Sequence, residues 1–254
     1  MFVHARFRTS VGLLTMLGVS LPALSQPTGA TTIETPPRSI VVGFVGGFVR
    51  HDNPHHGAVQ LAQRIRSKVP KNTYVEVFEN RRRKQARDAV LHLLDANHDG
   101  TLSQEEKDQA RVILFGQSWG GAAVVLLARD LQREGIPVLL TVQVDSVAKL
   151  WQDDSVIPAN VAEAVNFYQP HGIVHGLQRI TAADPSKTEV LGNYRIDYRK
   201  TPIDCAHSSW YDRLFTPDHA QSECDPQLWS HIEDLVRQRL SSYIDTTAAA
   251  NPQP

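Results

Sequence analysis

Residues 112–123 read VILFGQSWGGAA and combine a strand-like, a turn-like and a helix-like segment. The first four residues are apolar without a break, which is typical of a β-strand buried on both faces. Gly116, Ser118 and Gly120 then fit the pattern G-x-S-x-G, and residues 122–132 have the apolar content of a helix. A strand, a sharp turn and a helix in this order display a serine hydroxyl at the top of the turn, while the glycines keep side chains out of it. The stretch therefore predicts Ser118 as a nucleophile.

Strand-like and helix-like segments alternate on both sides of this stretch. We expect strands at residues 39–45, 74–78, 112–115, 138–144 and 188–191, and helices at residues 58–69, 85–94, 104–109, 122–132, 161–167 and 226–244. Such alternation is typical of βαβ units and predicts a mostly parallel sheet flanked by helices. A chain of 254 residues with 41% hydrophobic residues can form one such domain, which we place at residues 38–245.

The G-x-S-x-G motif in this setting resembles the α/β-hydrolase family, in its serine esterase and thioesterase-like branch, over residues 38–244. The resemblance implies an oxyanion hole made of two backbone N–H groups. One belongs to Trp119, which follows the nucleophile. The other belongs to the loop after the first strand, as Gly47 or Phe48. That loop departs from the His-Gly-Gly-Gly form of many lipases, which leaves the choice between these two residues open.

The family order of nucleophile, acid and base leads to the other two catalytic candidates. Asp145 follows the apolar strand at residues 138–144 and would lie beside Ser118 at the carboxyl edge of the sheet, where ligands bind in such folds. The remaining candidates for the acid are Asp184, Asp197 and Asp204. His219 stands in a polar loop just before the final helix and is the preferred base, with His207 as the alternative. His231 falls inside the final helix, which argues against it.

The amino-terminal segment and the two cysteines indicate an exported protein. Arg6 and Arg8 precede a short apolar stretch at residues 11–24, which predicts a signal peptide at residues 1–25. We expect disordered segments at residues 26–37 and 246–254. In a secreted or periplasmic protein, Cys205 and Cys224 are expected to form a disulfide. No later segment is long and apolar enough to span a membrane, and the net charge of −1 gives no basis for binding nucleic acid.

Residues 95–106, DANHDGTLSQEE, fit the EF-hand calcium loop at every position. Oxygen ligands are predicted from Asp95, Asn97, Asp99, the Thr101 carbonyl, Ser103 and Glu106. Gly100 would allow the sharp turn. A single loop of this kind has no paired partner, so we expect structural Ca²⁺ rather than a calcium sensor.

These features predict a secreted serine hydrolase that cleaves a small-molecule or lipid-like carboxylic ester or thioester, with a structural calcium site. The alternative is a non-catalytic exported calcium-binding protein on a hydrolase scaffold, and a serine peptidase is a weaker third option. The two main hypotheses differ in one structural respect. Catalysis requires Ser118, a carboxylate and a histidine within hydrogen-bond reach of one another, whereas a binding protein has no such requirement.

Overall fold

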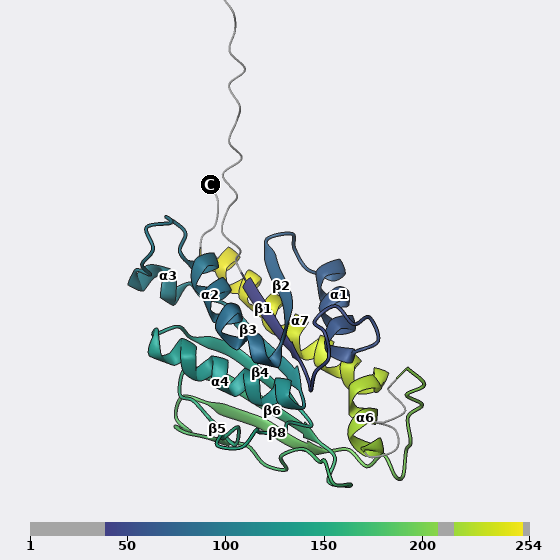
Figure 1. The fold of residues 1–254 in the computed structure, drawn as a ribbon. Helices are drawn as coiled ribbons and strands as arrows, with labels where there is room; N and C mark the ends of the chain where they lie inside the picture. The colour runs from purple at the N-terminus through teal and green to yellow at the C-terminus, as the bar shows by residue number, and fades with distance from the viewer. Residues whose placement is uncertain (1–38, 208–215, 251–254) are drawn as a thin grey trace, which may run out of the picture. The chain divides into compact units, whose positions relative to one another are not determined.

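The computed structural model describes residues 39–207 and 216–250. Its centre is a six-stranded sheet with the strand order β2-β1-β3-β4-β6-β8, in which every neighbouring pair is parallel (Figure 1). The six strands are β1 (Ser39–Val45), β2 (Thr73–Glu79), β3 (Val112–Gln117), β4 (Val138–Val144), β6 (Val161–Tyr168) and β8 (Glu189–Arg195). Two short strands, β5 (Val156–Ile157) and β7 (Thr181–Ala182), form a separate parallel pair.

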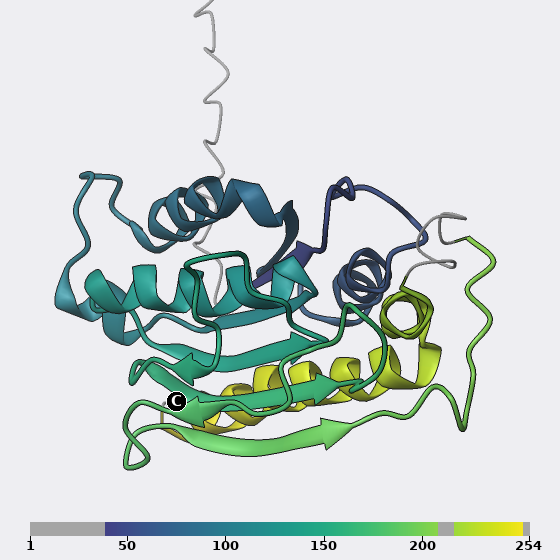
Figure 2. The ribbon, with the colours of Figure 1, turned by 60° about the horizontal axis from the view of Figure 1, so that its bottom comes forward.

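Helices cover both faces of the sheet. Alternate side chains of β1 point to opposite faces, and those of each face pack into a separate apolar core. Ile40, Val42 and Phe44 belong to a core shared with the helices α2 (Arg83–Leu94) and α4 (Trp119–Arg133). Val41 and Val45 belong to the core of the opposite face, shared with α1 (Gly57–Lys68) and α7 (Pro226–Ala250). Figure 2 shows α2 and α4 side by side over the strands. The other helices of the described residues are short: the 3₁₀ helix η1 (Asn80–Arg82), α3 (Gln104–Asp108) and α6 (Pro217–Cys224).

The predicted fold class, a mostly parallel sheet flanked by helices, is confirmed. The residues that follow β1, β3, β4 and β6 all lie at one edge of the sheet, because the carboxyl ends of parallel strands point the same way. This edge is where open parallel sheets bind their ligands. None of the helices within the described ranges is long and apolar enough to cross a membrane.

Two expectations about secondary structure differ from the fold. The predicted helix at residues 161–167 is wrong, since this segment is β6, a central strand paired on both sides. The final helix α7 extends to Ala250, although residues 246–254 were expected to be disordered. Residues 248–250 are alanines, which have the highest helix propensity and continue a helix that is already formed. The predicted signal peptide, the lead-in at residues 26–37 and residues 251–254 lie outside the described residues.

Candidate active site

Ser118 occupies a strained turn between β3 and α4. Its backbone has φ 56° and ψ −127°, a conformation that L-residues rarely adopt. A Cβ at Gly116 would collide with the backbone of Gly120, and a Cβ at Gly120 would collide with the carbonyl of Phe44. The Ser118 N–H donates to the carbonyl of Val144 at 2.9 Å, which fixes the turn against the end of β4. The two glycines of the motif are therefore required by the close packing of the turn.

The structure brings Ser118, His219 and Asp145 into one hydrogen-bonded chain. His219 Nε2 lies 2.8 Å from Ser118 Oγ, and His219 Nδ1 lies 2.6 Å from Asp145 Oδ2. With the Nδ1 proton directed at the carboxylate, Nε2 is free to accept the proton of the Ser118 hydroxyl. Asp145 directly follows β4, as expected. His219 was expected in a loop, but it is the third residue of the short helix α6.

Asp145 is fully buried and is surrounded by hydrogen-bond donors. In addition to His219, it accepts the backbone N–H of Gln169 at Oδ1 and the side-chain amide of Gln169 at Oδ2, both at 3.0 Å. A Cβ at Gly176 would collide with its carboxylate, so the loop after β6 covers the acid closely. A buried carboxylate needs such donors, because an uncompensated charge is costly to remove from water. The sequence did not point to Gln169, whose only signal is its place just after β6.

The alternative acids and bases lie elsewhere. His207 is exposed and stacks on His55, with ring centroids 4.1 Å apart. Asp197 pairs with His171, Arg195 and Lys200, and Asp184 accepts hydrogen bonds from Ser186. Asp204 is an exposed residue of the loop before Cys205. Within the described part of the chain, none of these side chains is hydrogen-bonded to Ser118, whose hydroxyl pairs with His219.

The proposed oxyanion donors border the nucleophile. Trp119 is the first residue of α4, so its N–H has no acceptor within that helix. Gly46 lies against the turn, since a Cβ there would be only 2.8 Å from Ser118 Cβ. Gly47 and Phe48 occupy the middle of a tight turn closed by a hydrogen bond from Val49 N–H to the Gly46 carbonyl at 3.2 Å.

A buried polar network, which no sequence motif indicates, links the segments that carry the nucleophile and the base. Gln117, one residue before Ser118, donates from Nε2 to Ser222 Oγ at 3.3 Å, and Ser222 Oγ donates to the carbonyl of His219 at 2.7 Å.

His56, which is fully buried, accepts the N–H of Ala58 at Nδ1 and so caps α1. Burial, together with the neighbouring His219, lowers the pKa of His56 to about 3. His56 is therefore neutral at physiological pH.

The predicted disulfide between Cys205 and Cys224 is present, with Cα atoms 5.9 Å apart. Cys224 is the last residue of α6, the helix that carries His219. The bond closes a loop with a sequence separation of 19 residues. It thus tethers the base-bearing helix to the segment that follows β8.

The loop at residues 95–106 turns its oxygen atoms inward. Asp95 accepts the N–H groups of Asp99 and Gly100, and Glu106 reaches back to accept the N–H of Ala96 at 2.8 Å. Hydrogen bonds from Thr101 lower the pKa of the Asp99 carboxyl, and those from Ser103 lower the pKa of Glu106. Both carboxylates are therefore ionised at neutral pH. Across residues 39–207 and 216–250, no group of three or more His, Cys, Asp and Glu side chains has the arrangement of a metal site.

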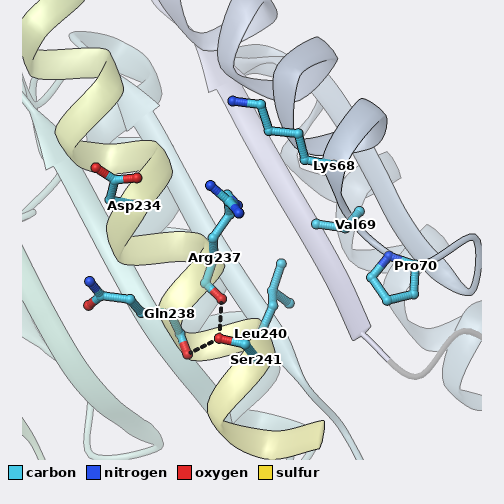
Figure 3. A pocket seen from close by; sticks show the side chains of 8 residues that line it. All are labelled: Lys68, Val69, Pro70, Asp234, Arg237, Gln238, Leu240 and Ser241. Carbon is cyan, nitrogen blue, oxygen red and sulfur yellow. Dashed lines mark hydrogen bonds between the residues drawn. The ribbon is translucent and has the colours of Figure 1, made fainter.

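In the described part of the chain, one cavity lies near the triad and another lies away from it. A cavity of about 510 Å³ runs between the loops after β4 and β6, with Ser146 and Gly176 in its wall next to Asp145. The other, of about 270 Å³, lies between the end of α1 and the middle of α7 (Figure 3). Its residues Val69 and Pro70 come just before β2, at the amino edge of the sheet and therefore away from Ser118. Figure 3 shows the Ser241 hydroxyl bonded to carbonyls of its own helix in this second cavity, and the nearby Lys68 is paired with Glu233.

The chain is similar to solved structures of hydrolases at low sequence identity. A cutinase-like protein from Cryptococcus sp. is 12% identical, with a TM-score of 0.41, covering 82% of this chain and 97% of that chain. The RedJ thioesterase of the prodiginine biosynthetic pathway in Streptomyces coelicolor is also 12% identical, with a TM-score of 0.35, covering 81% of this chain and 96% of that chain. No family model and no curated protein matches the sequence.

Proposed function

We propose that this protein is an exported serine hydrolase that cleaves a carboxylic ester or thioester through an acyl-enzyme intermediate. The observation that carries the proposal is the chain of hydrogen bonds from Ser118 Oγ to His219 Nε2 and from His219 Nδ1 to Asp145. Nucleophile, base and orienting acid in this order are the arrangement that activates a serine hydroxyl. A binding protein would not need three such residues at the carboxyl edge of the sheet.

The geometry supports a two-step acyl transfer. His219 Nε2 takes the proton of the Ser118 hydroxyl as Oγ attacks the carbonyl carbon, and Asp145 stabilises the imidazolium that forms. The N–H groups of Trp119 and of the loop after β1 stabilise the oxyanion. His219 then gives its proton to the leaving alcohol or thiol as the ester bond breaks. Water attacks the acyl-enzyme by the same route, releasing the acid and restoring the Ser118 hydroxyl.

The test is hydrolysis of p-nitrophenyl butyrate by the wild type and by Ser118→Ala, with Ser67→Ala as the matched control. Ser67 is an exposed serine of α1 whose hydroxyl donates to the Arg64 carbonyl of the same helix. We expect Ser118→Ala to lose activity by a factor on the order of 10⁴ or more, and Ser67→Ala to retain it. A fluorophosphonate should label the wild type and not Ser118→Ala. A wild type that neither hydrolyses esters or thioesters nor accepts the label would favour the non-catalytic calcium-binding protein.

The calcium site belongs to the same proposal as a structural element. The donor set of the loop, made of carboxylate, amide, hydroxyl and carbonyl oxygens, suits Ca²⁺ in chemistry. Asp95, Asn97, Asp99, Thr101, Ser103 and Glu106 would hold the ion, which would fix the connection between α2 and β3. Since β3 leads directly to Ser118, this clip would stabilise the chain just before the nucleophile.

Calcium binding is tested by titration calorimetry and by the melting temperature with and without a chelator. We expect a 1:1 isotherm for the wild type that is lost in Glu106→Gln. Glu105→Gln is the matched control, because Glu105 is the neighbouring carboxylate at a non-ligand position of the loop. Equal melting temperatures with and without chelator, together with a flat isotherm, would remove calcium from the proposal and leave the hydrolase intact.

Export is supported by the disulfide, because disulfides persist in oxidising compartments. Sequencing the amino terminus of the protein recovered from outside the cytoplasm tests this proposal. We expect the mature chain to begin near Gln26. A mature chain that retains Met1 would contradict a cleaved signal peptide.

A further inference from the structure

The peptide that joins Gly47 to Phe48 is held from one side. Its carbonyl oxygen accepts a hydrogen bond from Asn80 Nδ2 at 2.6 Å. In a planar trans peptide, the C=O and the following N–H point in opposite directions. Asn80 therefore turns the Phe48 N–H away from itself. In a turn whose first residue, Gly46, lies against Ser118, this orientation makes the Phe48 N–H the better candidate for the second oxyanion donor.

Asn80 is well placed to set this orientation. It follows β2, and β2 pairs with β1 so that Glu79 lies opposite Val45. Asn80 is thus beside the point where β1 ends and the turn begins. Its side chain is buried, and the same amide also donates to the carbonyl of Val45 at 3.3 Å. One buried amide therefore joins the carbonyls on both sides of Gly46.

Lys149 connects this amide to the side chain of Trp119, the residue whose backbone N–H is the other proposed donor. Its ammonium donates to Asn80 Oδ1 at 2.7 Å and lies 4.7 Å from the ring centroid of Trp119. The ring of Trp119 in turn meets the ring of Phe48 edge to face, with centroids 5.4 Å apart. Lys149 comes from the loop after β4, so three separate loops meet at these contacts. A cation at this position also adds positive potential where the oxyanion forms.

We propose that Asn80 and Lys149 are positioning residues that hold the Phe48 and Trp119 N–H groups in place for the oxyanion. This inference rests on the proposed acyl transfer at Ser118. Neither side chain touches the reacting atoms. Their effect is to fix the direction of two donors before the substrate arrives, which is how an oxyanion hole stabilises a transition state without reorganisation.

The test compares Asn80→Ala with Asn160→Ala on p-nitrophenyl butyrate. Asn160 is a matched control, because its amide also donates to two backbone carbonyls, that of Ala128 in α4 and that of Ile136 just before β4. We expect kcat to fall by about 30-fold in Asn80→Ala, with KM within twofold, because the loss of a whole oxyanion donor costs on the order of 100-fold or more. The affinity for phenylboronic acid, which forms a tetrahedral adduct with the serine, should fall in parallel with kcat. Asn160→Ala should lower the melting temperature without lowering kcat.

Lys149→Met provides a second variant in case Asn80→Ala does not fold, since Lys149 is only partly buried. We expect kcat to fall about fivefold in Lys149→Met, in keeping with the loss of one charged hydrogen bond, and Lys149→Arg to restore most of it. The proposal is overturned if both Asn80→Ala and Lys149→Met keep the wild-type kcat and boronate affinity. It is also overturned if Asn160→Ala loses as much kcat as Asn80→Ala. A wild type without any hydrolysis or labelling would be the failure of the proposed function instead.

Discussion

Gln169 donates two hydrogen bonds to Asp145, one from its backbone and one from its side chain, each at 3.0 Å. The backbone bond goes to the oxygen that His219 does not use, and the side-chain bond goes to the oxygen that it does use. Gln169 therefore fixes the plane of the carboxylate and, through it, the orientation of the imidazole.

Replacing Gln169 by Leu should lower kcat by about tenfold, since one hydrogen bond to a charged group is lost while the backbone bond remains. Steady-state kinetics on p-nitrophenyl butyrate measures this effect. Gln143→Leu is the control, because Gln143 is a fully buried amide whose side chain donates to the Asp154 carbonyl instead. A tenfold loss in both variants would mean that general destabilisation, rather than the orientation of Asp145, is the cause.

Gly46→Ala should lower kcat by more than tenfold. A Cβ at this position would lie 2.6 Å from Gln117 Oε1 and 2.8 Å from Ser118 Cβ, so either the nucleophile or the oxyanion turn must move, and small displacements of reacting groups cost about 100-fold. Gly135→Ala is the control for the loss of a glycine. Gly135 has φ +74° and lies in the turn after α4, so its substitution is expected to cost stability through backbone strain alone. Wild-type kinetics in Gly46→Ala would show that this contact is not tight.

His56 should make the protein less stable in acid. Its pKa in the folded state is about 3, below its ordinary value of about 6.5, because burial opposes protonation. Between these two pH values only the unfolded chain binds the proton, so this contribution to stability is complete above pH ~6.5 and is lost as the pH falls toward about 3. Urea unfolding of the wild type and of His56→Asn, which keeps a helix-capping side chain, should differ in slope by about 1.4 kcal/mol per pH unit in this window. Parallel slopes would mean that the folded state can protonate His56.

Removing the disulfide by Cys205→Ala and Cys224→Ala should lower the free energy of unfolding by about 3 kcal/mol, as expected for a loop of this length. Since α6 carries both Cys224 and His219, kcat should fall as well. The double variant is measured by thermal unfolding and by ester hydrolysis, with reduced wild type as the comparison. Unchanged kcat in a clearly destabilised variant would mean that the disulfide stabilises the domain without holding the base.

Most of the fold could be predicted from local sequence patterns, because the signal for each of these elements lies within its own segment and does not depend on its neighbours. The strands β1, β3 and β4 are nearly continuous apolar runs, and the turn at Ser118 has its own motif. The helix predicted at residues 161–167 is instead the strand β6, because a short apolar run has no clear period that distinguishes a helix from a strand. Its strand conformation depends on pairing with β4 and β8, which are distant in sequence.

The candidate site likewise contains residues with a local sequence signal and residues whose role depends on contacts between distant segments. Ser118, Asp145 and His219 could be chosen because motif, strand end and chain order restrict each of them. Asn80, Lys149 and Gln169 could not, because an Asn, a Lys or a Gln in a loop has no local pattern that indicates its partner. Their contacts exist only after three loops from different strands meet at the carboxyl edge of the sheet.

Two members of the proposed triad have backbones in the region that favours glycine, with φ 56° at Ser118 and φ 43° at Asp145. Each such residue costs about 1 kcal/mol or more relative to glycine. The backbone conformation at these two positions therefore favours glycine over the serine and the aspartate of the proposed triad. If the proposed triad is catalytic, glycine at either position would relieve backbone strain and remove the reacting or orienting side chain, so that the strain is a stability cost tied to the proposed activity.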